Sequence, residues 1–212
     1  MTPSSRRRPA DAAVANVRQL SQVCHKQGPA SFDAFEKLAN ALLCLTIAHD
    51  VGGLHLTRSK DTKERKATLY GGRGADESAI RLRNDRFLKI MVSLFLGEDR
   101  YLRVGVSQFQ YQADPEGNDW IFRYDYEREP GKKRYPAAHL HVRGAFTVAH
   151  CLPKKKRLED VHFYSIRPTL EATIRLLIEQ FRVPPANRPA VWQPALAESE
   201  RIFFENAHLP SP

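Results

Sequence analysis

Two short runs of alternating polar and apolar residues, Trp120–Tyr126 and His139–Arg143, constrain the fold of this chain most. Alternation over four or more residues predicts a β-strand with one buried face, because successive side chains point to opposite sides of a sheet. The polar residues of both runs are expected on one face of the sheet. The aromatic residues of the first run are expected to share the other face: Trp120, Phe122, Tyr124 and Tyr126.

A turn-rich and basic connection separates the two runs, and it predicts an antiparallel hairpin centred near Lys132. The parity of this pairing places Asp125 opposite His139, and it places Arg123 opposite His141. Facing residues on one side of such a ladder have Cβ atoms roughly 4.5–5.5 Å apart. We therefore expect these four side chains to form one polar cluster on a sheet face, in a register that a single bulge would change.

The first interpretation of this cluster is an enzyme that cleaves RNA without a cofactor. Such cleavage needs a base for the 2′-hydroxyl group, an acid for the leaving oxygen and a cation for the developing charge. His139 and His141 are the candidate acid–base pair. Asp125 is expected to orient one imidazole, and Arg123 or Arg143 is expected to contact the phosphate.

Two other interpretations of the cluster stay open at this point. The first is a metal site, because His-x-His on a strand puts His139 and His141 on one face and Asp125 adds a carboxylate. Two histidines and one carboxylate suit iron or another divalent metal ion with open coordination positions. The second is a purely structural role, since polar residues alternate outward on any half-exposed sheet and Asp–His or Asp–Arg pairs across strands are ordinary.

Positive charge is concentrated beside the predicted hairpin. Residues 128–157 contain nine Lys or Arg residues and one acidic residue, Glu129, in a chain with a formal net charge of +9. Such a patch favours a polyanionic partner, most simply RNA or DNA, although it also suits a solvated surface. The candidate nucleic-acid-binding residues are the basic ones and two tyrosines that could stack on bases: Lys132, Lys133, Arg134, Arg143, Lys154, Lys155, Lys156, Arg157, Tyr126 and Tyr135.

The rest of the chain predicts an α+β architecture. Apolar residues recur at helical spacing in four segments: 11–26, 32–49, 167–181 and 196–206. Alternating or continuous apolar runs predict further strands: 54–57, 67–70, 87–96, 101–112 and 161–163. Because helices and strands fall in separate blocks, we expect an antiparallel meander of about four to six strands, with the N-terminal and C-terminal helices packed on one face.

The predicted elements suggest one main domain. Residues 1–10 are expected to be a disordered basic tail, because they offer little apolar surface to bury. Residues 11–183 are expected to form a single α+β domain. Residues 184–212 are expected to form a proline-bearing connector and a C-terminal amphipathic helix.

Several classes of protein are disfavoured by composition. The three cysteines are odd in number and form no CxxC motif, which argues against a disulfide framework and a thiolate zinc site. No apolar run approaches the ~20 residues that a membrane span needs, and the N-terminus does not resemble a signal peptide. We therefore expect a cytoplasmic protein with reduced thiols and no membrane partner.

The sequence Phe122-Arg123-Tyr124-Asp125, followed by His139-Leu140-His141, resembles the TumE-like toxins of bacterial toxin–antitoxin modules. The resemblance covers roughly residues 87–146, and the arginine and alanine usage of the whole chain is similar to that of actinobacterial proteins. The resemblance implies a β-rich core and an RNA-targeting or translation-blocking activity. It also implies a protein partner, such as an antitoxin, and functional roles for the four residues of the cluster.

Two functional hypotheses of different class follow. A ribonuclease-like toxin or defence effector predicts that His139 and His141 are accessible and face each other across a groove rimmed by the basic residues. A non-catalytic basic module would instead bind nucleic acid, or a protein within a bacterial defence or phage-related assembly. In that module, salt and the loss of lysines would weaken binding, whereas His→Ala changes would leave it intact.

Overall fold

The computed structural model describes residues 9–50, 53–59, 65–71, 79–131, 135–143 and 163–206. Two helices open this part of the chain and two close it: α1 (Pro9–Cys24), α2 (Ala30–Leu45), α3 (Leu170–Glu179) and α4 (Pro189–Asn206). Eight strands lie between them: β1 (Leu54–Arg58), β2 (Lys66–Gly71), β3 (Ala79–Arg81), β4 (Phe87–Leu96), β5 (Leu102–Gln112), β6 (Trp120–Glu127), β7 (Ala138–Val142) and β8 (Phe163–Tyr164). The predicted α+β class is confirmed, with more strands than the four to six expected.

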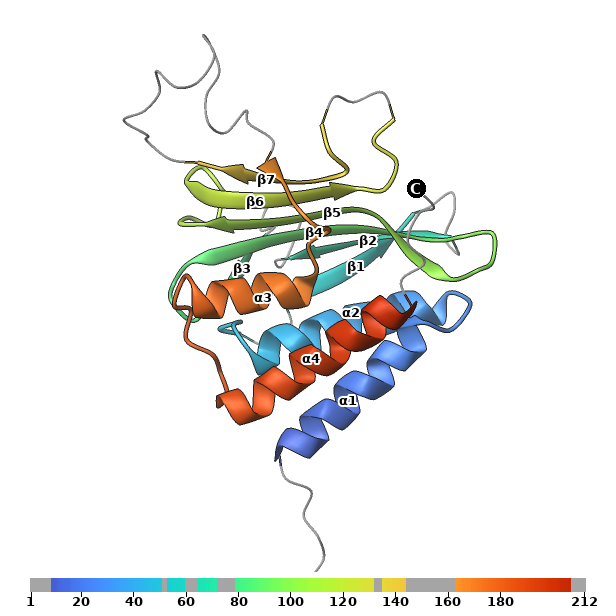
Figure 1. Ribbon diagram of the computed structural model, residues 1–212, viewed down its shortest axis with the longest axis horizontal. Coiled ribbons are helices and arrows are strands. Elements are labelled where there is room, and N and C mark those ends of the chain that lie inside the picture. Colours follow the sequence, from blue (N-terminus) through green and yellow to red (C-terminus); the bar gives the residue numbers. More distant parts are fainter. Residues whose placement is uncertain are drawn as a thin grey trace, which may run out of the picture.

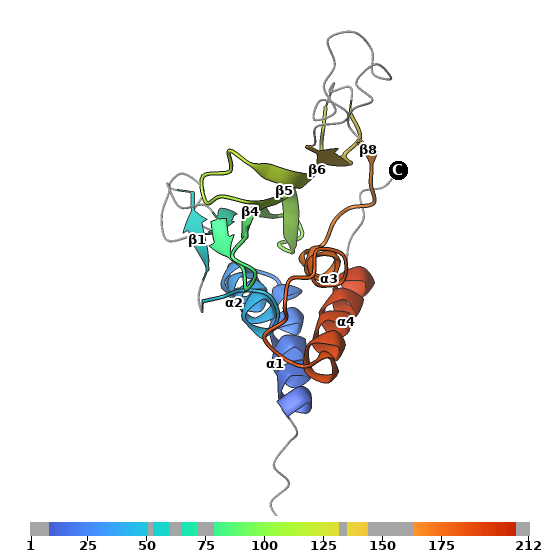
Figure 2. The same cartoon turned by 90° about the vertical axis from the view of Figure 1, so that its left-hand side faces the viewer.

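The strands form one antiparallel sheet. Its order is β1-β2-β4-β5-β6-β7-β8, and β3 pairs with β4 beside this path. Figures 1 and 2 show the helices gathered on one side of a curved sheet, with α2 and α3 closest to the strands and α1 and α4 mostly outside them. The predicted meander with N-terminal and C-terminal helices on one face is therefore confirmed.

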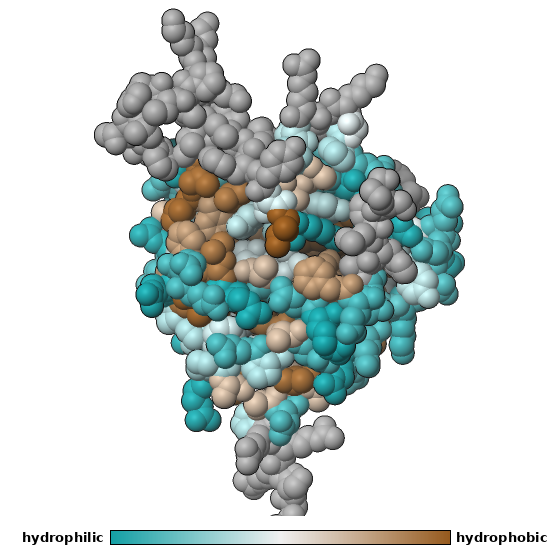
Figure 3. All heavy atoms as spheres, in the orientation of Figure 1, coloured by the Kyte–Doolittle hydropathy of each residue, from teal (hydrophilic) through white to brown (hydrophobic). Residues whose placement is uncertain are grey.

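The hydrophobic core lies between this helical layer and the sheet. The continuous apolar run of residues 87–96 predicts a strand, and strand β4 forms there with buried and half-buried positions in alternation along its whole length. Its buried side chains pack with the apolar stripe of α2, including Phe32, Leu42 and Leu43. Figure 3 shows the complementary pattern from outside: the surface over the helices is mostly hydrophilic, and hydrophobic residues gather higher, towards the sheet.

A bulge changes the face on which Trp120 lies. The pairing of β5 with β6 skips Ile121, so that Trp120 is opposite Gln112. The guanidinium carbon of Arg123 lies 5.8 Å from the centroid of the Trp120 ring. The expectation that Trp120 shares a face with Phe122 is therefore wrong, because one extra residue in the strand moves Trp120 to the polar side.

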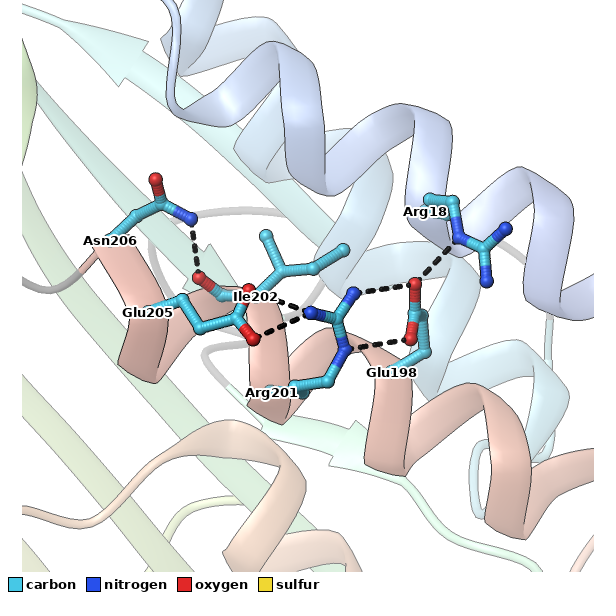
Figure 4. A network of polar contacts seen from close by, with 6 residues as sticks. All are labelled: Arg18, Glu198, Arg201, Ile202, Glu205 and Asn206. Atoms are coloured by element: carbon cyan, nitrogen blue, oxygen red, sulfur yellow. Dashed lines mark hydrogen bonds and ion pairs between the residues drawn. The ribbon is translucent and has the colours of Figure 1, made fainter.

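The C-terminal helix is part of the helical layer. It begins at Pro189, earlier than the predicted start at residue 196, and it continues through Pro194 although proline lacks a backbone N–H donor. Figure 4 shows Glu198 of α4 between Arg18 of α1 and Arg201. Arg18 Nε lies 2.6 Å and Arg201 Nε lies 3.1 Å from the Glu198 carboxylate. Hydrogen bonds from Arg201 and Arg18 lower the pKa of Glu198 to about 2.

Two of the three cysteines lie in the described residues, and both are free thiols. Cys24 is buried, and burial raises the pKa of its thiol to about 12. Cys44 is half-buried, and Cys151 lies outside the described residues. Within the described part of the chain, no helix combines the length and apolar character needed to cross a membrane.

Candidate metal centre

The polar cluster forms in the predicted register. Strands β6 and β7 pair with Asp125 opposite His139 and with Arg123 opposite His141. The parity argument is therefore confirmed for the hairpin, which has no bulge within this ladder. The opposite face of β6 carries Phe122, whose ring centroid lies 5.2 Å from that of Phe181, just after α3. The cluster consequently lies on the sheet face that the helices leave open.

One carboxylate oxygen is the centre of this cluster. Oδ2 of Asp125 lies 2.8 Å from Nε of Arg123 and 3.3 Å from Nε2 of His141. Nε2 of His139 lies 3.9 Å from the same oxygen. The other oxygen, Oδ1, accepts a hydrogen bond of 3.1 Å from the amide of Gln108 on β5. Three strands thus hold a single carboxylate and direct two imidazole nitrogens towards it.

The imidazole of His139 is fixed from its other side. Its Nδ1 lies 2.8 Å from the carbonyl oxygen of Pro136. Because a carbonyl oxygen can only accept a hydrogen bond, Nδ1 carries the proton of the neutral ring, and Nε2 then presents a lone pair towards Asp125. The ring also packs 4.8 Å from the ring of Tyr135 and 5.0 Å from the ring of His141.

Both histidines are buried, although the rest of the cluster reaches solvent. His139 is 4% and His141 is 6% exposed, whereas the side chains of Asp125 and Arg123 are 20% and 31% exposed. The expectation that both imidazoles are accessible across a groove is therefore wrong. Contacts between rings cover part of this surface, because the His139 ring packs between the rings of Tyr135 and His141.

The donor atoms of this cluster fit a small divalent metal ion. Asp125, His139 and His141 each offer one ligand atom, and these atoms lie within 4.8 Å of one another. Donors bound to zinc at tetrahedral angles are about 3.3–3.5 Å apart, so the Asp125–His141 distance already fits and His139 needs a small rotation. The contact of His139 Nδ1 with a backbone carbonyl is the type of outer contact that orients a metal-binding histidine.

A row of glutamines beside the cluster was missed by the sequence reasoning. Gln108, Gln110 and Gln112 lie on the same face of β5, and the last two are 7% and 0% exposed. Gln112 donates hydrogen bonds to the carbonyl oxygens of Asp114 and Pro115, so the β5–β6 loop is tied to this face. The alternation in QFQYQ, residues 108–112, is the signal that could have revealed this polar row.

The β5–β6 loop is closed by Asp114. Its carboxylate accepts hydrogen bonds from the backbone N–H groups of Gly117, Asn118 and Asp119. Partial burial acts to raise the pKa of Asp114, but these N–H donors outweigh it and lower the pKa. Gly117 has a φ of +83°, a conformation that favours glycine, and an added Cβ would lie 3.1 Å from the amide of Gln110.

The predicted nucleic-acid-binding residues that the structure describes lie in different environments. Arg143 is exposed and donates a hydrogen bond to the carbonyl oxygen of Asn118. Tyr135 is half-buried against His139. The expectation that Tyr126 stacks on bases is wrong, because its side chain is buried on the helix-covered face beside Arg167. The other predicted contacts lie outside the described residues: Lys132, Lys133, Arg134, Lys154, Lys155, Lys156 and Arg157.

Comparison of the chain with protein-family models, with curated proteins and with solved structures found no match. The class of protein is therefore defined by its fold and its site alone. It is an α+β protein with one antiparallel sheet, helices on one face, and a cluster of two buried histidines and one carboxylate on the other.

Proposed function

We propose that Asp125, His139 and His141 bind one divalent transition-metal ion, and that the protein uses this centre to hydrolyse phosphodiester bonds in RNA. The observation that carries the proposal is the convergence of two imidazole nitrogens and one carboxylate oxygen within 4.8 Å of one another. The contact between His139 Nδ1 and Pro136 also supports it, because the tautomer that this contact selects places on Nε2 the lone pair that a metal ligand needs.

Burial favours a metal over acid–base catalysis by the histidines alone. General acid–base catalysis requires each imidazole to come within about 3 Å of a substrate proton. His139 and His141 are 4% and 6% exposed, which leaves little surface for a polynucleotide to approach. Asp125 reaches solvent from the same cluster. An ion held there would lower the pKa of a bound water molecule and polarise a phosphoryl oxygen.

Three residues around the cluster have roles in this proposal. Gln108 holds Oδ1 of Asp125 and leaves Oδ2 to face the imidazoles. Arg123 contacts Oδ2 through Nε, and its partly exposed guanidinium is positioned to bind a phosphate oxygen of the substrate. Arg143, exposed at the end of β7, offers a second cation for the polyanion.

RNA is the substrate that we propose, and the charge distribution supports a polyanion of this kind. Nine basic residues fall within 128–157, beside the strands that carry the cluster. The resemblance of the Arg123–Asp125 and His139–His141 motifs to TumE-like toxins supports the same choice, together with a role as a toxin or defence effector controlled by a protein partner. A non-catalytic nucleic-acid-binding module is the competing function, since the basic residues serve it equally well.

RNA cleavage by the purified full chain tests the proposal. We expect cleavage that stops in EDTA and returns with Zn²⁺ or Mn²⁺. His141→Ala should lower the rate about 100-fold or more, because even outer contacts of metal ligands contribute 10–100-fold. His55→Ala is the matched control, since this histidine is exposed on β1 at the far end of the sheet.

Each other outcome rejects the proposed metal chemistry. Cleavage that persists in EDTA but is lost in His139→Ala and His141→Ala would establish metal-free acid–base catalysis instead. Absence of cleavage with any metal, together with salt-sensitive RNA retention by every variant, would leave a binding module with structural histidines.

A further inference from the structure

A partly open cavity of about 110 Å³ lies between the helical layer and the sheet. Its walls are mostly apolar and include Leu38 and Leu42 of α2, Ile90 of β4 and Phe109 of β5. An engineered apolar cavity of about 150 Å³ binds benzene, so this space suits an apolar group of similar or smaller size. The cavity is separated from Asp125 by the sheet, because its walls come from the helix-covered face.

Three arginines line the same cavity: Arg103, which pairs with Asp99, and two others. Arg128 follows β6, and Arg167 precedes α3. The guanidinium of Arg167 lies 4.6 Å from the ring centroid of Tyr126 and 5.0 Å from that of Phe203. Nε of Arg128 donates a 3.0 Å hydrogen bond to the carbonyl oxygen of Val104. Aromatic rings and one carbonyl group, rather than carboxylates, are therefore the contacts of these two cations in the described structure.

Neither Arg128 nor Arg167 forms an ion pair with a carboxylate in the described part of the chain, where their guanidinium groups contact a carbonyl oxygen and aromatic rings instead. Burial lowers the pKa of Arg167, and the nearby charge of Arg128 lowers it further. Both arginines are half-buried, and a charge that is partly withdrawn from water gains more from a counter-charge than a fully exposed one. The pair therefore offers a positively charged contact for an anion at the wall of an apolar space.

The one carboxyl group in the cavity wall forms no ion pair with either arginine in the described structure. Glu171 of α3 is 7% exposed and accepts a hydrogen bond from the hydroxyl of Ser199. Burial raises the pKa of Glu171, which favours its neutral form. Ser21 of α1 also lines the cavity, and its buried hydroxyl has no hydrogen-bond partner in the described structure. The wall thus offers positive charge and an unpaired hydroxyl group beside apolar surface.

We propose that this cavity binds a small amphipathic monocarboxylate, whose carboxylate pairs with Arg128 and Arg167 and whose apolar body occupies the space between α2 and β4. The Ser21 hydroxyl supplies a further hydrogen bond to the ligand. The inference is independent of the proposed metal centre, because it concerns residues on the other face of the sheet. It adds a ligand-binding site to the core of the protein.

Calorimetric titration of the full chain with benzoate, hexanoate and octanoate tests the proposal. The matched neutral probes are benzyl alcohol, hexanol and octanol. A charge-assisted hydrogen bond contributes enough to make at least one carboxylate bind about 10-fold to 100-fold tighter than its alcohol. Methyl signals of Leu42 and Ile90 should shift in NMR spectra of the complex, since both side chains line the cavity.

Variants separate the anion site from the apolar space. Arg167→Gln and Arg128→Gln should each remove most of the preference for carboxylate while weak binding of the alcohol remains. Ala39→Leu, which places extra carbon atoms in the cavity wall, should weaken both classes of probe. Arg58→Gln is the control, because this arginine pairs with Asp33 outside the cavity.

The proposal is overturned if the folded wild-type chain binds no carboxylate, or if it binds acid and alcohol equally. It is also overturned if Arg58→Gln lowers affinity as much as both cavity-arginine variants do. If one arginine variant misfolds, the other variant and the wild-type probe series still distinguish these outcomes.

Discussion

Nε2 of His141 lies 3.3 Å from Oδ2 of Asp125, and this contact joins neighbouring strands on the open face of the sheet. The same carboxylate accepts hydrogen bonds from Nε of Arg123 at 2.8 Å and from the side-chain amide of Gln108 at 3.1 Å. Asp125 therefore connects side chains of three neighbouring strands, in addition to its proposed role as a metal ligand. Loss of Asp125 should therefore affect both metal binding and stability.

Asp125→Ala is expected to destabilise the fold by about 1–3 kcal/mol, because it leaves the polar groups of His141, Arg123 and Gln108 without their acceptor. Urea unfolding of the two chains measures this difference. Glu205→Ala is the control, since Glu205 pairs with Arg201 on the surface of α4, where such pairs contribute about 0–1 kcal/mol. Equal losses in the two variants would contradict a central role for Asp125.

The neutral imidazole of His139 is expected to carry its proton on Nδ1, because that nitrogen faces the Pro136 carbonyl oxygen at 2.8 Å. Long-range ¹H–¹⁵N NMR correlations distinguish the two tautomers directly. A spectrum with the proton on Nε2 would show that this nitrogen is unavailable as a metal ligand.

Glu171→Gln is expected to stabilise the protein at neutral and alkaline pH and to have little effect near pH 4. Burial raises the pKa of Glu171 above 4.5, so the unfolded chain loses this proton at a lower pH than the folded chain. Stability therefore falls as pH rises from about 4.5 towards the raised pKa, and glutamine removes that penalty. Melting temperatures of both chains between pH 4 and 9 provide the measurement. A variant that is less stable than wild type by the same amount at every pH would contradict this ionisation.

Glu198→Gln is expected to lower the melting temperature at pH 7, because it weakens the link from α4 to Arg18 of α1. The pKa of Glu198 is lowered to about 2, so its contribution is present above the ordinary value of 4.5 and is lost as pH falls towards 2. Melts at pH 7 and pH 2.5 test this dependence. Glu205→Gln is the control, because Glu205 pairs with Arg201 on its own helix; an equal effect there would contradict a tie between helices.

Local patterns allowed much of this fold to be predicted. Alternation in 122–126 and 139–143 predicted the strand faces and the pairing of Asp125 with His139, because side chains alternate with a period of two and the hairpin ladder has no bulge. The predicted helix at 11–26 corresponds to α1, since its apolar spacing reports a buried stripe. The bulge at Ile121 has no comparable signal, and Trp120 was therefore assigned to the wrong face.

Long-range packing decided the features that could not be predicted. The pairing of β7 with β8 joins segments that lie about twenty residues apart in the chain. The juxtaposition of Arg128 and Arg167 likewise depends on how the connection before α3 passes the end of β6. Neither feature leaves a periodic pattern in the sequence, because the residues involved belong to separate elements.

Metal uptake by the full chain tests the central claim most directly. After removal of metals with a chelator, titration with Zn²⁺ or Mn²⁺ should show one ion bound per chain. Binding should be lost in His141→Ala and in Asp125→Ala, and it should be retained in His55→Ala. A folded wild-type chain that binds no ion, or binding that is equal in all four proteins, would contradict a metal centre at Asp125, His139 and His141.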